Sequence, residues 1–294
     1  MSIIFAILLF SVLIFVHELG HFVAAKLSGV QVNEFAMFMG PAIAKWKRGE
    51  TEYSIRCIPI GGYCAMEGED TDTENPRSFQ KAAWWKRLII LVAGSAMNLI
   101  AGFLIVAIVN SFAAAPIPQV DSLRTGSSLA CEGGLQVGDE ILEVDGERVF
   151  VYSDFTMLLG LNGGPEHDLL LERNGEKLLL EDFPMEMREF PNEDGTVSLR
   201  YGFSFGIEEA NLGDKLSHVW NQAMDTVRMV RLSLKMLFNG QAGLNDMAGP
   251  VGIVSQMNEI AEESETTGMA ILNLLSVGSF LAINLAVMNL LPIP

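Results

Sequence analysis

The chain is poor in cysteine and in positive charge. Its 294 residues include three cysteines, Cys57, Cys64 and Cys131, too few and too scattered for a disulfide framework or a cysteine-ligated zinc site. There are 19 lysines and arginines against 36 acidic residues, a balance that argues against nucleic-acid binding. Charged residues, at 19%, fall below the roughly 25% usual in soluble domains, whereas half of the residues are hydrophobic. These deficits favour a membrane protein.

Long stretches with few or no charges predict three membrane spans. Residues 1–27, 84–110 and 268–294 are each long enough to cross about 30 Å of hydrocarbon. The first could instead be a secretory signal, but it lacks a positively charged start, so a retained helix is expected. The second contains Gly94, Asn98 and other small residues, which predict close contact with the first span and a hydrogen bond from Asn98 across it.

Charge placement predicts the orientation of the chain. Residues 26–87 hold nine lysines and arginines against eight acids, whereas 110–267 hold ten against 27. Because positive residues near span ends favour the cytoplasm, we expect 28–83 inside the cell. The long acidic segment and the N-terminus are then outside.

His17, Glu18 and His21 form a zinc-protease signature, His17-Glu18-Leu19-Gly20-His21, directly after a charge-free stretch. Helical residues four apart differ by about 40° in azimuth, so both imidazoles can face one metal ion. Zn²⁺ held in this way lowers the pKa of a bound water to roughly 7, and Glu18 can accept the proton of that water as it attacks a carbonyl. The alternative is a pair of polar side chains hydrogen-bonded in a core. Ionisable groups within a span are costly and usually mark function, so peptide-bond hydrolysis is the favoured interpretation.

The segment 28–83 is predicted to fold into short strands near the membrane. Alternating and β-branched residues in 52–59 indicate a strand, and Gly61-Gly62 predicts a turn before a further strand at 63–66. An exposed edge of such a sheet could hold an extended peptide by strand addition. An ordinary structural hairpin is an equally open alternative.

A compact β-rich domain is predicted over 115–208, because short β-like runs alternate there with turns and with a helical segment at 152–161. Apolar residues spaced three and four apart then predict an amphipathic helix over 214–238. This helix either rests on the membrane surface or packs against the β-rich domain. The run Gly249-Pro250-Val251-Gly252 predicts a break in any continuation.

Six motifs occur in the order that one family shows. They are His17–His21, Ile58-Pro59-Ile60-Gly61-Gly62-Tyr63, Ala93-Gly94-Ser95-Ala96-Met97-Asn98, Gly-Leu-Gln-Val-Gly-Asp at 134–139, Gly249-Pro250-Val251, and Asn289-Leu290-Leu291-Pro292-Ile293-Pro294. In these motifs the chain resembles the intramembrane site-2 metalloproteases, in particular the bacterial RIP metalloprotease branch with one PDZ domain. The resemblance implies a polytopic α-helical membrane protein with a cytoplasmic β-hairpin region and an inserted extracytoplasmic PDZ-like domain. It implies Zn²⁺ as cofactor, held by His17 and His21 beside a catalytic Glu18, in the inner (cytoplasmic) membrane.

The resemblance also implies what is cut and how it is held. The substrate would be a single-span membrane protein, of the anti-sigma-factor type or a signal-peptide remnant, cleaved in regulated intramembrane proteolysis. The PDZ domain would filter substrates outside the membrane. The hairpin, with Gly61, Gly62 and Tyr63, would clamp an unwound substrate helix, and Asn289 would contact it near the catalytic centre.

The chain departs from the family pattern in three places. The family's Gly-Phe-Gly-Pro reads Phe38-Met39-Gly40-Pro41, and its Ala-Gly-Pro in the second span reads Ala93-Gly94-Ser95. The third zinc ligand of the family is an aspartate that follows Asn-Leu-Leu-Pro-Ile-Pro, which puts it past Pro294. A third ligand is therefore not assigned within these 294 residues.

Two other classes of function stay open. A catalytically inactive membrane receptor could use its PDZ domain to capture extracytoplasmic peptides, and a metal transporter could use the intramembrane histidine pair. Glu18 favours the enzyme over the transporter, because transport needs no positioned base.

Overall fold

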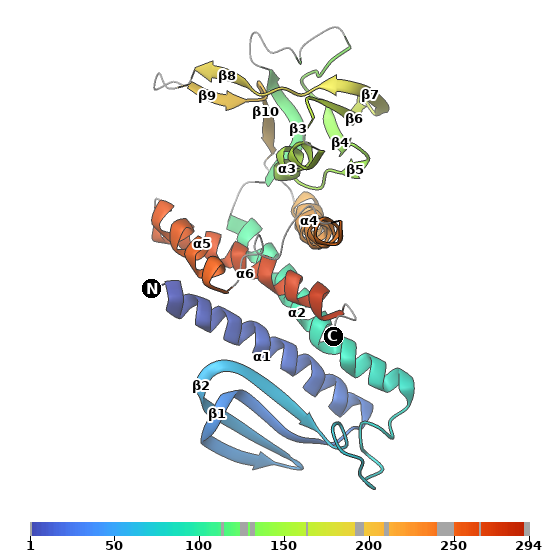
Figure 1. Ribbon diagram of the computed structural model, residues 1–294, viewed down its shortest axis with the longest axis vertical. Coiled ribbons are helices and arrows are strands. Elements are labelled where there is room, and N and C mark those ends of the chain that lie inside the picture. The colour runs from blue at the N-terminus through green and yellow to red at the C-terminus, as the bar shows by residue number, and fades with distance from the viewer. Residues whose placement is uncertain are drawn as a thin grey trace. The chain divides into compact units, whose positions relative to one another are not determined.

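The computed structural model describes residues 2–112, 115–123, 129, 133–162, 164–191, 197–208, 212–239, 250–264 and 266–290. Cys131, Gly249 and the final Leu291–Pro294 lie outside the described residues. The chain divides into two compact units, one formed by 1–109 with 226–294 and the other by 110–225 (Figure 1).

Three helices of the first unit are long and apolar enough to cross a membrane. They are α1 (Ser2–Ser28), α2 (Trp84–Phe112, which runs on into the second unit) and α6 (Thr267–Leu290). The apolar stretches of the sequence indicated the same three segments. Most of their large side chains that are exposed, such as Leu8, Leu104 and Ile271, are apolar, as a lipid-facing surface requires.

Glycines set how closely these helices approach one another. A Cβ on Gly20 of α1 would collide with the carbonyl oxygen of Ala93 on α2. A Cβ on Gly102 of α2 would lie 2.5 Å from Cγ1 of Ile283 on α6, and one on Gly278 would lie 2.9 Å from Cδ1 of Leu9. All three helices therefore contact one another closely at glycines. This is the small-residue packing that association in lipid favours.

Two long strands, β1 (Val32–Arg48) and β2 (Thr51–Met66), form a curled antiparallel sheet beside α1 (Figure 1). The first part of β1 pairs on both sides, since Phe35 has both Cys64 and Tyr53 as partners. The turn predicted at Gly61-Gly62 is wrong, because both glycines lie within β2 and Gly62 pairs with Met37. Gly61, with φ of 82°, instead marks an irregularity in the pairing.

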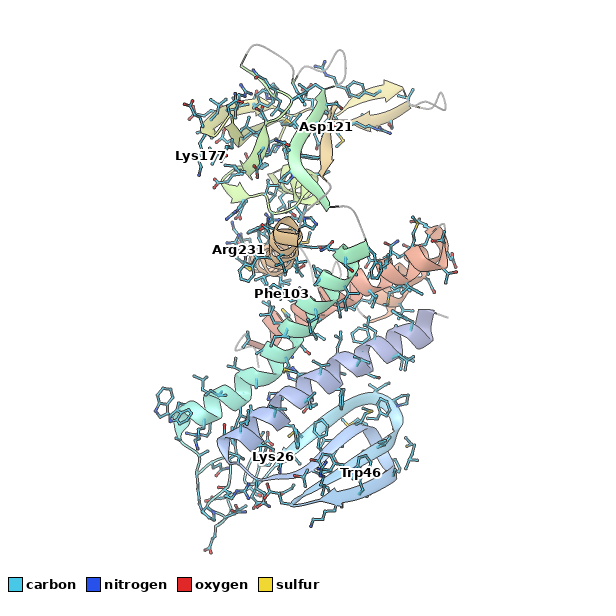
Figure 2. All side chains as sticks on the ribbon, turned by 180° about the vertical axis from the view of Figure 1, so that it is seen from behind. Lys26, Trp46, Phe103, Asp121, Lys177 and Arg231 are labelled. Carbon is cyan, nitrogen blue, oxygen red and sulfur yellow. The ribbon has the colours of Figure 1, made fainter. Side chains whose placement is uncertain are left out.

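Apolar side chains and one charged cluster join this sheet to the helices. Phe35 packs against Phe22 of α1 at a ring-centroid distance of 4.9 Å, within a buried cluster that also holds Val32 and Ile90. Lys26 lies near the C-terminal end of α1 (Figure 2) and its Nζ lies 2.7 Å from Oε1 of Glu50 in the β1–β2 turn. Arg77 donates to the same carboxylate. The polar 70–76 segment is largely exposed and without helix or strand.

The second unit is built on an antiparallel sheet. Its strand order is β10-β3-β4-β6-β7, with β5 paired to β4. The bounds are β3 Ala115–Leu123, β4 Glu140–Val144, β5 Glu147–Arg148, β6 Glu166–Arg173, β7 Glu176–Pro184 and β10 Phe203–Glu208. A separate hairpin joins β8 (Arg188–Pro191) to β9 (Val197–Arg200), and α3 spans Tyr152–Asn162. Phe155 of α3 is buried against Phe203 and Phe205, at ring-centroid distances of 5.4 and 5.5 Å.

Two further helices follow the β-rich region. Helix α4 (Leu212–Phe238) has buried apolar residues such as Val219, Ala223 and Val230, while Leu216 and Trp220 are exposed. Helix α5 covers Pro250–Glu263 and is separate from α4, which ends at Phe238. Proline is favoured in the first turn of a helix, where its missing N–H is not needed, so Pro250 begins α5 rather than excluding a helix.

Candidate metal and catalytic site

His17 and His21 lie on one face of α1, and their ring nitrogens converge. Nε2 of His17 is 3.1 Å from Nε2 of His21. Two imidazole nitrogens at about 2.0–2.1 Å from one tetrahedral Zn²⁺ would be about 3.3 Å apart. The pair therefore fits a shared zinc ion with only a small adjustment of the rings.

Helix α2 holds these imidazoles from the opposite side. Nδ1 of His21 lies 2.7 Å from the carbonyl oxygen of Ile90, which fixes a proton on Nδ1 and leaves Nε2 free for a metal. Nδ1 of His17 lies 3.4 Å from Nδ2 of Asn98. Between these two contacts is Gly94, where a Cβ would come within 2.8 Å of both rings. The cross-helix hydrogen bond predicted for Asn98 is thus directed at the zinc motif.

Glu18 lies between the motif and the sheet. A Cβ on Gly62 of β2 would be 3.7 Å from Cγ of Glu18, and the Glu18 carboxylate interacts with the backbone of Cys64. Gly62, one of the residues predicted to hold substrate, therefore brings bare backbone next to the predicted general base.

Tyr63, the next residue, belongs to a polar network that the sequence did not reveal. Arg56 donates to Glu34 (2.7 Å), to the Tyr63 hydroxyl and to the carbonyl of Gly40 (2.7 Å). Burial, and then the neighbouring Glu34, raise the pKa of Tyr63 to about 12. Burial alone would raise the pKa of Glu34, but its hydrogen bonds from Arg56 and Ser54 lower it. Glu34 and Arg56 are 22 residues apart, so no local motif could have joined them.

Asn289 lies near the end of α6 and is exposed. Within the described ranges, no cluster of three or more His, Cys, Asp or Glu side chains is placed to hold a metal ion. In the part of the chain that the structure covers, the motif therefore offers two imidazoles and one carboxylate.

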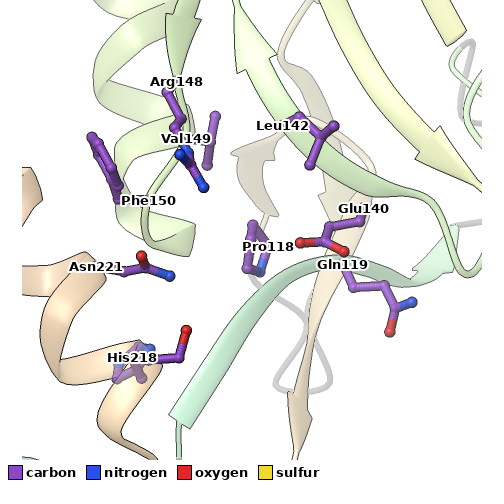
Figure 3. A pocket seen from close by; sticks show the side chains of 10 residues that line it. Pro118, Gln119, Glu140, Leu142, Arg148, Val149, Phe150, His218 and Asn221 are labelled. Carbon is purple, nitrogen blue, oxygen red and sulfur yellow. The ribbon is translucent and has the colours of Figure 1, made fainter. Parts of the chain in front are cut away.

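A separate cavity of about 400 Å³ occurs in the second unit (Figure 3). It is lined by β3, β4, the segment around Arg148 and the first half of α4, where burial lowers the pKa of His218. Its polar lining includes Gln119, Glu140 and Asn221, and its apolar lining includes Leu142 and Phe150. No residue of the zinc motif takes part.

The sequence profile of Peptidase family M50 matches residues 5–294. The chain belongs to this family. This confirms the resemblance to the site-2 metalloproteases and establishes the protein as a zinc-dependent peptidase associated with a membrane.

Individual relatives agree with this assignment to M50. The protein is 34% identical over 295 residues to a Clostridium acetobutylicum protein named "Putative zinc metalloprotease", a match that covers all of this chain and 83% of the relative. It is 26% identical over 376 residues to "Regulator of sigma-W protease RasP" of Bacillus subtilis, covering all of this chain and 86% of that protein. It is also 30% identical to a "Probable membrane metalloprotease" of Arabidopsis thaliana, where the match covers all of this chain and 68% of the relative.

Proposed function

We propose that this M50 peptidase cleaves single-span membrane proteins inside the bilayer, with His17 and His21 as zinc ligands and Glu18 as general base. The observation that carries the proposal is the convergence of two Nε2 atoms, 3.1 Å apart, within a helix apolar enough to span a membrane. The Bacillus subtilis relative is named as a regulator of sigma-W, which supports substrates of the anti-sigma-factor type. Signal-peptide remnants share the single-span chemistry and belong to the same substrate class.

Each residue of the site has a stated role in this mechanism. When bound, Zn²⁺ supplies a Lewis acid that polarises the scissile carbonyl and makes a water acidic enough to attack at neutral pH. Glu18 accepts the proton of the attacking water and then returns it to the departing amine. The Ile90 carbonyl keeps His21 in the tautomer that can ligate.

Substrate binding is assigned to the neighbouring sheet. A helical substrate has no free backbone for a protease, so the scissile segment must be extended before cleavage. β2 is suited to hold it, because Gly62 places backbone without a side chain beside Glu18, while the Arg56–Glu34 network fixes Tyr63. Asn289 is proposed to contact substrate from α6.

We place the β1–β2 sheet in the cytoplasm and the β-rich unit outside the inner membrane, because positive residues concentrate in the first loop. The β-rich unit, whose main antiparallel sheet packs against α3, is proposed to be a PDZ-like domain that filters substrates.

The catalytic proposal is tested with purified protein in liposomes and a single-span reporter peptide. Glu18→Gln should keep zinc and lose cleavage by at least about 100-fold, the low end of the contribution expected of a general base. His21→Ala should lose both. Undiminished cleavage by the Glu18→Gln protein would refute the mechanism, and peptide capture without cleavage by the unmodified protein would favour the receptor alternative.

A further inference from the structure

One buried polar atom beside the zinc motif has no partner. Asn98 is 1% exposed, and its Oδ1 makes no hydrogen bond, whereas its Nδ2 faces Nδ1 of His17. Leaving a buried amide oxygen unpaired destabilises the fold, so such an atom in a packed helix interface requires an explanation.

The chemistry of a ligating histidine supplies the explanation. If Nε2 of His17 binds zinc, Nδ1 must carry the ring proton and needs an acceptor. His21 has this arrangement, because its Nδ1 lies 2.7 Å from the Ile90 carbonyl oxygen. Nδ1 of His17 faces the Asn98 NH₂ instead, which is a donor and cannot accept the proton, and the ring also interacts with the backbone of Gly94.

The oxygen and nitrogen of a side-chain amide have nearly the same shape, so which one faces a neighbour is decided by the hydrogen-bond network. A half-turn of the Asn98 amide would put Oδ1 where Nδ2 lies, 3.4 Å from His17 Nδ1. This single change would both satisfy the unpaired oxygen and give His17 the acceptor that a zinc ligand needs.

We infer that Asn98 is a positioning residue for the metal site, whose Oδ1 accepts the Nδ1 proton of His17 and holds Nε2 toward zinc. Ile90, Gly94 and Asn98 are spaced four apart and therefore share one face of α2. The first accepts from His21, the second gives room for both rings, and the third accepts from His17. Helix α2 thus determines the tautomer of both histidines without contributing a ligand.

The test measures zinc affinity by chelator competition, separately from activity. Asn98→Ala should weaken zinc binding about 10- to 100-fold, the range seen for residues that orient metal ligands. Asn98→Asp keeps the acceptor and should stay within a few-fold of the unmodified protein. Val106→Ala, which opens a cavity elsewhere on α2, is the matched control and should leave affinity unchanged. Unchanged affinity in Asn98→Ala, or equal loss in Asn98→Ala and Val106→Ala, would overturn the inference.

Nitrogen NMR gives a readout that does not depend on how the variants fold. The chain has only four histidines, so the zinc-loaded unmodified protein with isotope-labelled histidine can be assigned residue by residue. His17 should show a protonated, hydrogen-bonded Nδ1 and a metal-bound Nε2. A His17 protonated on Nε2 would overturn the inference.

This inference rests on the proposed ligand role of His17, and His17→Ala separates the two. If His17→Ala binds zinc normally, the proposed site itself fails. If His17→Ala loses zinc while Asn98→Ala retains it, only the role of Asn98 fails.

Discussion

Gly94 of α2 lies so close to His21 of α1 that a Cβ in place of its hydrogen would be 2.5 Å from the imidazole Nε2. The same Cβ would lie 2.8 Å from Nε2 of His17. We therefore expect Gly94→Ala to push both rings apart and to weaken zinc binding by at least about 10-fold, as loss of ligand orientation does elsewhere. Chelator competition measures the effect.

A glycine in open surroundings provides the control. A Cβ on Gly160 of α3 would have no atom of another residue within 4 Å, and the φ of Gly160 is not positive. Gly160→Ala should leave zinc affinity unchanged and raise stability by up to about 1 kcal/mol, since alanine is the better helix former. If Gly94→Ala binds zinc like Gly160→Ala, the tight α1–α2 contact does not exist in the membrane.

Phe38 stands where the family pattern has glycine, and its φ is 70°, in the left-handed region. A left-handed backbone costs a non-glycine residue about 1–2 kcal/mol. We expect Phe38→Gly to be more stable than Phe38→Ala by about 1 kcal/mol, measured by unfolding in detergent. Both variants remove the ring, so their difference reports the backbone alone, and equal stabilities would contradict a left-handed Phe38.

Glu50 predicts a pH dependence of stability. Hydrogen bonds from Arg77 and Lys26 lower the pKa of Glu50 from 4.5 to about 2. Because the pKa is lower in the folded state, this carboxylate stabilises the fold fully above pH 4.5 and loses that contribution as the pH falls toward about 2. The thermal unfolding midpoint of Glu50→Gln should lie below that of the unmodified protein at pH 7. The difference between the two midpoints should become smaller as the pH falls from 4.5 toward about 2. A gap that stays constant with pH would contradict the ion-pair explanation.

Thiol labelling tests the proposed orientation. Asp72 and Glu176 are both exposed, the first in the loop after β2 and the second at the β6–β7 turn. In a background without native cysteines, a cysteine at position 72 should resist an impermeant reagent in intact cells, while one at 176 should react. The reverse pattern would invert the topology and place the β-rich unit in the cytoplasm.

Deleting the β-rich unit tests its proposed role as a filter. Replacing 118–205 with a short flexible linker should retain cleavage of short reporters and admit bulkier, untrimmed ones, because the zinc motif lies in the other unit. The rate ratio for bulky against short substrates is the measurement. A folded, zinc-loaded deletion protein that cleaves neither would show that the unit is needed for catalysis itself.

The sequence predicted best those features that depend on residues near one another. His17 and His21 converge because they are four apart on a helix, and the apolar segments form helices with few interruptions. A hydrogen bond from Asn98 across a helix contact is predictable, but its partner depends on how α1 and α2 align, which no local pattern states. The ion pair between Glu34 and Arg56 could not be predicted either, because the two residues are 22 positions apart and meet only through the β1–β2 pairing.

The turn predicted at Gly61-Gly62 is wrong because strand pairing with a distant segment outweighs the local preference for a turn. Gly61-Gly62 favours a turn by itself, yet β1 offers Met37 as a partner for Gly62 and the strand continues through an irregularity. The break expected at 249–252 concerned the preceding helix; α4 ends at Phe238, and proline can begin the separate helix α5 at 250.

Under the proposed function, the contact between α1 and α2 limits how a substrate can reach the zinc motif. His21 contacts Ile90 and His17 contacts Asn98 across this interface, so parting the two helices would release both imidazoles from their supports. We therefore expect that a substrate helix cannot insert between α1 and α2 without disturbing the two histidines. Under the proposed function, a substrate therefore reaches Glu18 along β2, beside Gly62, which has no side chain there.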